Sequence, residues 1–351
     1  MTRFLASVTS VAEAETALAG GADIVDCKDP GKGALGALPP QTVGAIVRAV
    51  GGRRPVSAVT GDLPMLPDVV VNAAQEMAAT GVDYIKAGLF AGEGRPACIS
   101  ALAPLATRHR IIGVLFADGD PDFALLPLLA ASGFAGVMID TAGKGAGRLL
   151  THLGMPALDA FVKSCKMHGL MSGLAGSLEP PDVPRLVALA PDFLGFRGAL
   201  CKGGARGGGL DPQAVAVIAQ LVAPHGAIAP QAGVAADETD CIFVSDFTVP
   251  MRIGAYAYEH LAPQAVRFSV AVDVLRQGGQ SDDMRAVFSY DLIMDAIRVL
   301  AAGEAFAMVE TVAGRLAETM LAHPRAARVR VKVEKLDLGP FVVGVSIERQ
   351  R

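Results

Sequence analysis

Short apolar runs alternate with longer amphipathic segments through the first 225 residues of the chain. The runs predict buried strands, and the segments between them have the period of helices. The expected strands span residues 4–8, 24–28, 56–60, 84–88, 111–117, 137–141, 170–175 and 193–199. The expected helices include 69–79, 121–131, 155–168, 182–190 and 211–223. Thr9 or Ser10 can cap the first helix, and Glu13, three residues after Ser10, predicts a capping box. Eight repeated β-α units predict an α/β fold of the (β/α)8 TIM-barrel type. A doubly wound open sheet is the alternative, although it usually has fewer strands and a glycine-rich first turn.

The pattern changes after residue 223. Residues 224–239 contain Pro and Gly without a helical or strand period, which predicts a linker. Alternating runs at 241–249 and 265–275, helical stretches at 291–301 and 309–321, and alternating runs at 328–333 and 341–347 then follow. This order predicts a small α+β domain on an antiparallel sheet. We therefore expect a barrel at 1–223, a linker at 224–239 and a second domain at 240–351. Because a single small sheet of this kind often assembles into a ring, we also expect a homo-oligomer.

Composition narrows the range of partners. The net charge is −4, tryptophan is absent and aromatic residues make up 5% of the chain, so we expect no nucleic-acid partner. No apolar run reaches the roughly 18 residues of a membrane span, and the N-terminus does not resemble a signal peptide. Five scattered cysteines without a Cys-x-x-Cys pair predict reduced thiols and a cytoplasmic location. The histidines lack metal-ligand spacing, so we expect no metal and no cofactor, only small-molecule substrates.

Three expected strands end in ionisable side chains, namely Lys28, Lys86 and Asp140. Active sites of (β/α)8 barrels lie at the C-terminal ends of the strands, so these three groups are expected to share one site. Burying an ammonium group costs several kcal/mol, which makes a purely structural lysine unusual. Two structural alternatives stay open. One is a salt bridge between Lys28 and Asp26 on the same strand, and the other is a charge cluster that only lines the top of the barrel.

Two neighbouring lysines suit carbonyl chemistry. A lysine is a nucleophile only when neutral, so its usual pKa near 10.4 must be lowered by burial or by a second cation. One amine can then form a Schiff base while the other stays charged or moves protons. Asp26 and Asp140 can balance the charge, bind the substrate and transfer protons. The pattern favours carbon–carbon bond formation through an enamine.

The later loops predict a phosphate site. Residues 174–177 and 197–204 combine small residues with cations, and the loops after strands seven and eight are the common phosphate site of this fold. The glycine-rich stretch 143–147 lacks P-loop spacing, so Lys144 is interpreted as a loop lysine over the site. The expected substrate contacts in these three segments are Lys144, Ser177, Arg197, Gly198, Lys202 and Gly203.

Several motifs together resemble a known family. They are ADIVDCKDP at 22–30, GALG at 33–36, DYIKAGL at 83–89, IDTA at 139–142, LAGS at 174–177 and GALCKGG at 198–204. They resemble (5-formylfuran-3-yl)methyl phosphate synthase of methanofuran biosynthesis. The resemblance implies a barrel enzyme that condenses two glyceraldehyde 3-phosphate molecules, with Lys28 as the Schiff-base lysine and Lys86 as its proton-transferring partner. It also implies polar roles for Asp140 and Lys144 and phosphate contacts by Arg197 and Lys202. A shorter segment between Leu89 and Ile111 and the glycine-rich stretch 203–209 depart from the family pattern.

The C-terminal region has a second resemblance. The motifs IGAYAYE at 253–259, FSY at 288–290, VETVA at 309–313, VKVEK at 331–335 and VGVSIER at 343–349 resemble dihydroneopterin aldolase, a tunnelling-fold enzyme. That family forms rings and cleaves dihydroneopterin without a metal or a Schiff base. The resemblance implies that Glu310 anchors the pterin, that Lys335 is the general acid and base, and that Tyr290 and Glu259 belong to the site. Leu336-Asp-Leu after Lys335 departs from the family pattern. Aldolase, epimerase and inactive pterin-binding scaffold therefore stay open, as do structural roles for Glu310 at a helix start and Lys335 at a strand end.

Two hypotheses follow for the whole chain. The first is a bifunctional lyase that makes the furan phosphate and also cleaves 7,8-dihydroneopterin to 6-hydroxymethyl-dihydropterin and glycolaldehyde. The second is a furan phosphate synthase alone, whose C-terminal domain is an inactive oligomerisation module. The presence of Glu259, Tyr290, Glu310 and Lys335 favours the first.

Overall fold

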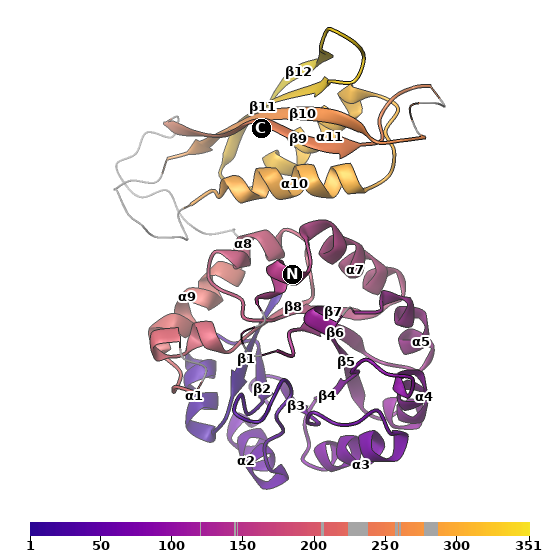
Figure 1. Ribbon diagram of the computed structural model, residues 1–351. Helices are drawn as coiled ribbons and strands as arrows, with labels where there is room; N and C mark the ends of the chain where they lie inside the picture. Colours follow the sequence, from indigo (N-terminus) through magenta and orange to yellow (C-terminus); the bar gives the residue numbers. More distant parts are fainter. Residues whose placement is uncertain are drawn as a thin grey trace. The chain divides into compact units, whose positions relative to one another are not determined.

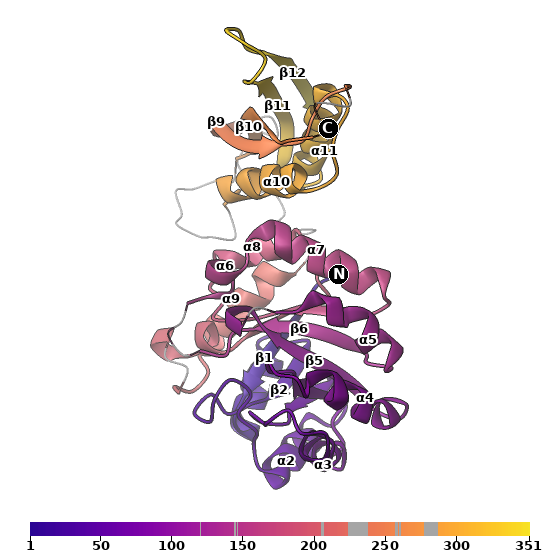
Figure 2. The ribbon, with the colours of Figure 1, turned by 45° about the vertical axis from the view of Figure 1, so that its right-hand side comes forward.

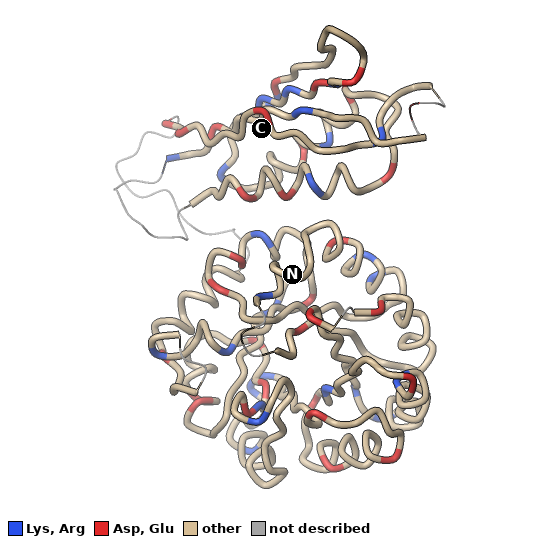
Figure 3. The backbone as a smooth tube through the Cα atoms, viewed as in Figure 1, with Lys and Arg blue, Asp and Glu red and all other residues tan. Residues whose placement is uncertain are grey.

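The chain forms two compact units, Met1–Ala223 and Pro224–Arg351 (Figure 1). The computed structural model describes residues 1–119, 121–143, 145, 147–204, 207–223, 238–256, 259, 261–276 and 287–351. Most of the predicted linker, 224–237, therefore lies outside the described residues. Acidic and basic residues are interspersed over both units (Figure 3).

The first unit is a closed barrel of eight parallel strands that follow one another in sequence order. Figure 1 shows the strands as an inner ring and the helices around them. The predicted (β/α)8 barrel is confirmed, and the doubly wound alternative is wrong because β8 pairs back with β1. The strands are β1 (Arg3–Val8), β2 (Ile24–Cys27), β3 (Val56–Val59), β4 (Tyr84–Gly88), β5 (Arg110–Phe116), β6 (Gly136–Asp140), β7 (Met171–Leu174) and β8 (Phe193–Phe196).

The helices of the barrel follow the predicted pattern with local differences. They are α1 (Val11–Ala19), α2 (Pro40–Val50), α3 (Pro67–Ala78), α4 (Arg95–Ala106), α5 (Leu126–Ala131), α6 (Leu149–His152), α7 (Met155–Met167), α8 (Asp182–Val187) and α9 (Pro212–Val222). The helix predicted from residue 121 begins only at Leu126, because Asp122 caps a short 3-10 turn, η2 (Phe123–Leu125), instead. Ser10 caps α1 as predicted, but the Glu13 carboxylate accepts from the Thr9 amide at 2.7 Å, so the predicted capping box is not formed.

Aspartates at the N-terminal ends of three even-numbered strands join each of them to the preceding strand. Asp23 accepts from the Phe4 amide at 3.0 Å, and Asp83 accepts from the Val56 amide at 2.8 Å. Asp192 accepts from the Ser172 amide at 2.7 Å. Each contact satisfies a strand-end amide that the ladder would otherwise leave unpaired. They help to fix the strand positions below the pocket.

The barrel interior is apolar toward its N-terminal end and polar on one side toward its C-terminal end. The buried apolar side chains toward the N-terminal end include Leu5, Ile24, Tyr84, Ile112 and Phe193. Above it, Ser7, Asp26 and Ser57 lie opposite one another in the register of β1, β2 and β3. All three are buried, so the register itself places a carboxylate between two hydroxyl groups.

The second unit is a four-stranded antiparallel sheet in the order β12-β11-β10-β9. Two helices cover one face of it (Figure 2) and bury the apolar side chains of alternate strand positions. The predicted α+β domain is thus confirmed. The elements are β9 (Thr239–Met251), β10 (Gln264–Leu275), α10 (Tyr290–Ala302), α11 (Val309–Leu321), β11 (Ala326–Lys335) and β12 (Val343–Gln350). None of the helices in the described part of the chain is long and apolar enough to cross a membrane.

Candidate functional site

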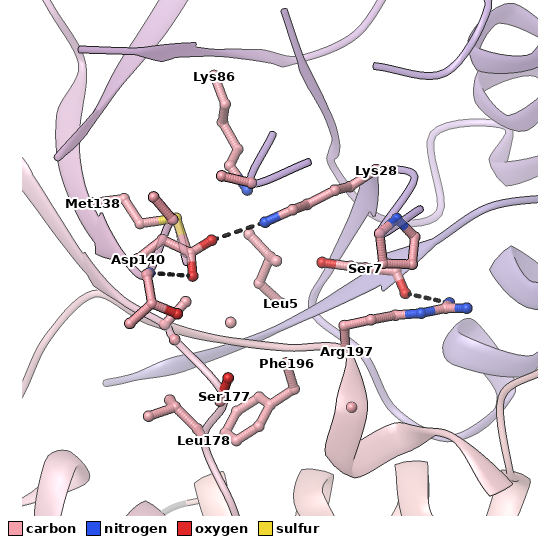
Figure 4. Close-up of a pocket in the computed structure, with 18 of the residues that line it drawn as sticks. Leu5, Ser7, Lys28, Lys86, Met138, Asp140, Ser177, Leu178, Phe196 and Arg197 are labelled. Atoms are coloured by element: carbon pink, nitrogen blue, oxygen red, sulfur yellow. Dashed lines mark hydrogen bonds and ion pairs between the residues drawn. The ribbon is translucent and has the colours of Figure 1, made fainter. Parts of the chain in front are cut away.

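A pocket opens at the C-terminal ends of the barrel strands. Strand ends and loops from both halves of the barrel line it, and Lys28, Lys86 and Asp140 are among the lining residues. Figure 4 shows these three side chains pointing toward one another, with Ser177 and Arg197 on the other side of the pocket. The three ionisable strand ends singled out in the sequence therefore meet at one site.

Lys28 forms an ion pair across the barrel mouth. Its Nζ lies 2.8 Å from Asp140 Oδ2, and the two side chains are 15% and 8% exposed. The other carboxylate oxygen of Asp140 accepts from the Thr141 amide at 2.8 Å. The alternative in which Lys28 pairs with Asp26 on its own strand is therefore wrong. The amine is both accessible from the pocket and in contact with a base that can receive its proton.

Lys86 forms a second, buried ion pair. Its Nζ lies 2.9 Å from Asp26 Oδ2, and the side chains are 2% and 0% exposed. Ser57 donates to Asp26 at 2.6 Å and Ser7 at 3.0 Å. Burial acts to raise the pKa of the Asp26 carboxyl, but the Lys86 charge, the Ser57 hydroxyl and the nearby Lys28 charge together hold that pKa below its ordinary value. Asp26 is thereby an ionised partner that fixes Lys86 beside the pocket.

Arg197, at the end of β8, is held by the protein itself. Its guanidinium pairs with Glu13 at 2.6 Å and donates to the carbonyl oxygens of Ser7 at 3.1 Å and Gly208 at 3.0 Å. Burial acts to raise the pKa of the Glu13 carboxyl, but its hydrogen bond with Arg197 contributes to a net lowering of that pKa. Arg197 thus joins the loop after β8 to α1, and its predicted phosphate contact stays a prediction.

The other predicted phosphate contacts divide into two groups. Ser177 and Gly198 line the pocket, and Ser177 has a φ of 51° directly after Gly176 at 118°. A Cβ at Gly176 would lie 2.8 Å from the Thr141 side chain, so only glycine fits this approach. Lys202 and Gly203 lie in the exposed 3-10 turn η4 (Lys202–Gly204), outside the lining residues. Lys144 lies outside the described residues.

Sequence reasoning missed the two serines and the second role of Glu13. Ser7 and Ser57 each interrupt an apolar strand at an inward position, which is a usable signal, since a buried hydroxyl needs a partner. Glu13 was interpreted only as a helix cap, and its contact with Arg197 spans 184 residues, which no local pattern reveals.

The second unit brings together two of its four predicted site residues. Lys335, at the end of β11, hydrogen-bonds to the carboxylate of Glu259, and both residues are buried. The bonds from Lys335 and from the Tyr256 amide hold the pKa of Glu259 below its ordinary value. Gly254 has a φ of 149°, and a Cβ there would lie 2.1 Å from the Glu259 carboxylate carbon. Glycine at this position therefore permits the pair to form.

The other two predicted residues are exposed on the single chain. Tyr290 is the first residue of α10 and is 58% exposed, and Glu310 lies in the first turn of α11. Within the described residues, neither side chain hydrogen-bonds to the pair of Lys335 and Glu259. In the same ranges, no three His, Cys, Asp or Glu side chains gather so that they could hold a metal ion.

Comparisons with known proteins match both units. Residues 4–219 match the sequence profile of 4-HFC-P synthase, and residues 242–349 match that of dihydroneopterin aldolase. A Methylorubrum extorquens protein, provisionally named (5-formylfuran-3-yl)methyl phosphate synthase, is 50% identical over 216 residues, which cover 61% of this chain and 89% of that one. The enzyme of that name from Methanopyrus kandleri is 38% identical over 219 residues, which cover 59% of this chain and 92% of that one.

Solved structures resemble the second unit. The Escherichia coli dihydroneopterin aldolase in complex with neopterin is 29% identical and covers 31% of this chain and 98% of that chain, with a TM-score of 0.28. The dihydroneopterin aldolase of Burkholderia thailendensis bound to guanine is 28% identical and covers 33% of this chain and 94% of that chain, with a TM-score of 0.30. By its barrel the chain belongs to the 4-HFC-P synthase family, and it carries a dihydroneopterin aldolase domain after that barrel.

Proposed function

We propose that the barrel condenses two molecules of glyceraldehyde 3-phosphate into (5-formylfuran-3-yl)methyl phosphate, with loss of water and one phosphate. Lys28 carries the reaction as a Schiff base. The observation that supports this most directly is the contact of its amine with Asp140 at 2.8 Å in the pocket. The relatives that bear the name of this synthase support the choice of substrate and product.

Asp140 serves as the base and acid for Lys28. It takes the ammonium proton of Lys28, and the free amine then forms a bond to the aldehyde carbon of the first triose phosphate. The hydroxyl group of this adduct leaves as water with a proton returned by Asp140, which gives the imine. Removal of a proton from the adjacent carbon then yields an enamine, which expels the phosphate from the third carbon of this triose. That third carbon then forms the carbon–carbon bond to the second triose. Ring closure through a hydroxyl oxygen with loss of water gives the furan, and hydrolysis of the imine returns the Lys28 amine.

Lys86 supplies a fixed positive charge and a proton to the same pocket. Because its ammonium is buried against Asp26, it does not need to be reorganised as negative charge develops on the reacting oxygens. Ser177 and Gly198 are the proposed phosphate contacts on the opposite wall. Lys202 and Gly203, in the exposed turn η4, are further proposed contacts. Arg197 acts on this wall through the loop that it holds.

The test mixes the full chain with glyceraldehyde 3-phosphate and follows an ultraviolet-absorbing furan together with released phosphate. The variant Lys28→Arg keeps a cation for Asp140 but cannot form an imine, so we expect it to fold and make no furan. The matched control is Lys32→Arg, because Lys32 lies in the same loop but is exposed, and its ion pair among the described residues is with Asp29 at 3.6 Å. Furan formation by Lys28→Arg at the rate of the control contradicts the proposal.

We propose a second activity for the C-terminal unit, the cleavage of 7,8-dihydroneopterin to 6-hydroxymethyl-dihydropterin and glycolaldehyde. The supporting observation is the buried contact of Lys335 with Glu259. In the proposed reaction Lys335 serves as general acid and base. Glu310 would accept two adjacent N–H groups of the pterin, a bidentate contact that suits a carboxylate. Since Glu310 and Tyr290 are exposed on one chain, we propose that a second copy completes the site in a homo-oligomer.

An inactive oligomerisation module is the alternative. It is favoured by exposed apolar side chains near the two edge strands, Phe243 on β9 and Phe341 before β12. An assay of glycolaldehyde release by the full chain separates the two. Activity in the wild type that Lys335→Met removes, with the same particle mass by light scattering, supports the aldolase. An oligomer that releases no glycolaldehyde supports the module.

A further inference from the structure

We propose that Asp62 and Asp118 are positioning residues that hold, on opposite sides of the barrel mouth, the loops adjoining Lys28 and Asp140. Neither residue is part of the lining of the pocket. The proposal rests on the proposed Schiff-base function of that pocket and names two residues on which its geometry depends.

Asp62 follows β3 and holds the loop after β2. Its Oδ2 accepts from the Ala34 amide at 2.8 Å and its Oδ1 from the Leu35 amide at 2.6 Å. The loop approaches so closely that a Cβ at Gly33, where φ is 109°, would lie 2.0 Å from Asp62 Oδ2. Gly33 and Ala34 both line the pocket, and this loop begins with Lys28. The carboxylate therefore fixes the segment beside the proposed nucleophile.

Asp118 follows β5 and holds the loop after β6 in the same way. Its Oδ1 accepts from the Ala142 amide at 2.8 Å and its Oδ2 from the Gly143 amide at 2.5 Å. Burial acts to raise the pKa of the Asp118 carboxyl, but hydrogen bonds from these two amides and from its own amide, together with His152, hold the pKa below its ordinary value. With the Thr141 amide bound by Asp140, three successive amides of this loop are each bound by a carboxylate.

The two contacts have the same construction on different strand pairs. In each, a carboxylate after an odd-numbered strand binds two consecutive amides in the loop of the neighbouring even-numbered strand, β3 to β2 and β5 to β6. Since β2 and β6 are four strands apart in an eight-stranded barrel, the contact of Lys28 with Asp140 spans the mouth. The distance between Lys28 and Asp140 depends on the positions of both loops. Displacement of reacting groups by about 1 Å can cost roughly 100-fold in rate.

A carboxylate suits this role because it accepts from two amides at once. Asparagine has nearly the same shape but offers one acceptor, and its NH2 group would face the second amide N–H. The change to asparagine therefore removes one hydrogen bond and adds a repulsion without adding bulk. Glutamate keeps both acceptors but moves them outward by one methylene group. These two changes separate the effect of loop position from the effect of losing a side chain.

The experiment measures kcat and KM for furan formation by the full chain with Asp62→Asn, Asp118→Asn and the double variant. The matched control is Asp122→Asn, because Asp122 lies in the same segment as Asp118 but its carboxylate accepts, among the described residues, from one amide, that of Ala124 at 2.9 Å. We expect each single variant to lose about 10- to 100-fold in kcat, as for residues that orient catalytic groups. The control should keep its rate. Because the contacts of Asp62 and Asp118 both set the distance between Lys28 and Asp140, the fold-loss of kcat in the double variant should be smaller than the product of the two single fold-losses.

Two further measurements separate positioning from folding. Circular dichroism reports the folded fraction, and borohydride trapping with glyceraldehyde 3-phosphate reports the rate of imine formation, which should fall with kcat in folded Asp118→Asn. If that variant does not fold, Asp118→Glu provides the test, and it should fold with a smaller loss of kcat. A folded Asp118→Asn or Asp118→Glu with kcat within twofold of wild type overturns the proposal. A wild type that makes no furan and traps no imine refutes the proposed function instead.

Discussion

Removing the charge of Lys86 tests the buried ion pair of the barrel. The Lys86→Met variant keeps most of the side-chain volume but takes away the ammonium group that lies 2.9 Å from Asp26. The Asp26 carboxylate then stays fully buried, with the hydroxyl groups of Ser7 and Ser57 as hydrogen-bond partners. The barrel should fold less stably, because the directly paired charge is lost and the more distant Lys28 charge offsets less of the desolvation cost.

The expected loss follows from the burial of the pair. Breaking a buried ion pair by removing one partner typically costs about 3–5 kcal/mol. We expect the lower part of that range, since two hydroxyl donors remain and the carboxyl can take up a proton. The double variant Asp26→Asn with Lys86→Met removes both charges and leaves an acceptor for the serines. It should cost only about 1–2 kcal/mol, which is less than Lys86→Met alone.

The assay is urea unfolding of the full chain. Hydrogen exchange of peptides from β1 to β4 is the readout, because it reports unfolding of the barrel separately from unfolding of the second unit. The free energy of unfolding is compared for wild type, each single variant and the double variant. A Lys86→Met barrel within about 1 kcal/mol of wild type contradicts a buried charged pair. A double variant whose loss equals the sum of the single losses would show that the two side chains do not interact.

Two further predictions concern the acid unfolding of the barrel and the activity of the second unit. The folded-state pKa of Asp26 lies below its ordinary value of 3.8, so its ionised form stabilises the barrel above about pH 4 and that contribution is lost as the pH falls further. Acid unfolding followed by circular dichroism should therefore be less steep for Asp26→Asn than for wild type; equal slopes would contradict this. Gly254→Ala should displace Glu259 from Lys335 and lower glycolaldehyde release, whereas Gly314→Ala, where a Cβ meets nothing within 4 Å, should not. Equal rates in these two variants would contradict the pairing.

The barrel could be predicted from the sequence because its strands are local features. Each strand is a short apolar run, and the strand ends that carry Lys28, Lys86 and Asp140 follow directly from where those runs stop. The fold class then implies that these ends share one edge of the barrel. Strand register within a barrel is regular enough that no further information was needed to bring the three groups together.

The pairing inside the site could not be predicted, because it depends on contacts across the barrel. Asp26 is two residues from Lys28 on one strand, yet Lys28 reaches Asp140, 112 residues away, and Asp26 binds Lys86. The amide contacts of Asp62 and Asp118 depend on loop conformations that have no periodic pattern. In the second unit, the hydrogen bond of Lys335 with Glu259 joins residues 76 positions apart. Such contacts are set by tertiary structure and have no local signal in the sequence.

The most direct test of the proposed mechanism is to identify the residue that captures the substrate. The full chain is incubated with glyceraldehyde 3-phosphate, reduced with borohydride, digested and analysed by mass spectrometry. We predict a triose adduct on the peptide that contains Lys28 and no adduct in Lys28→Arg. An adduct on Lys86 or on another lysine, with Lys28 unmodified, would contradict the account.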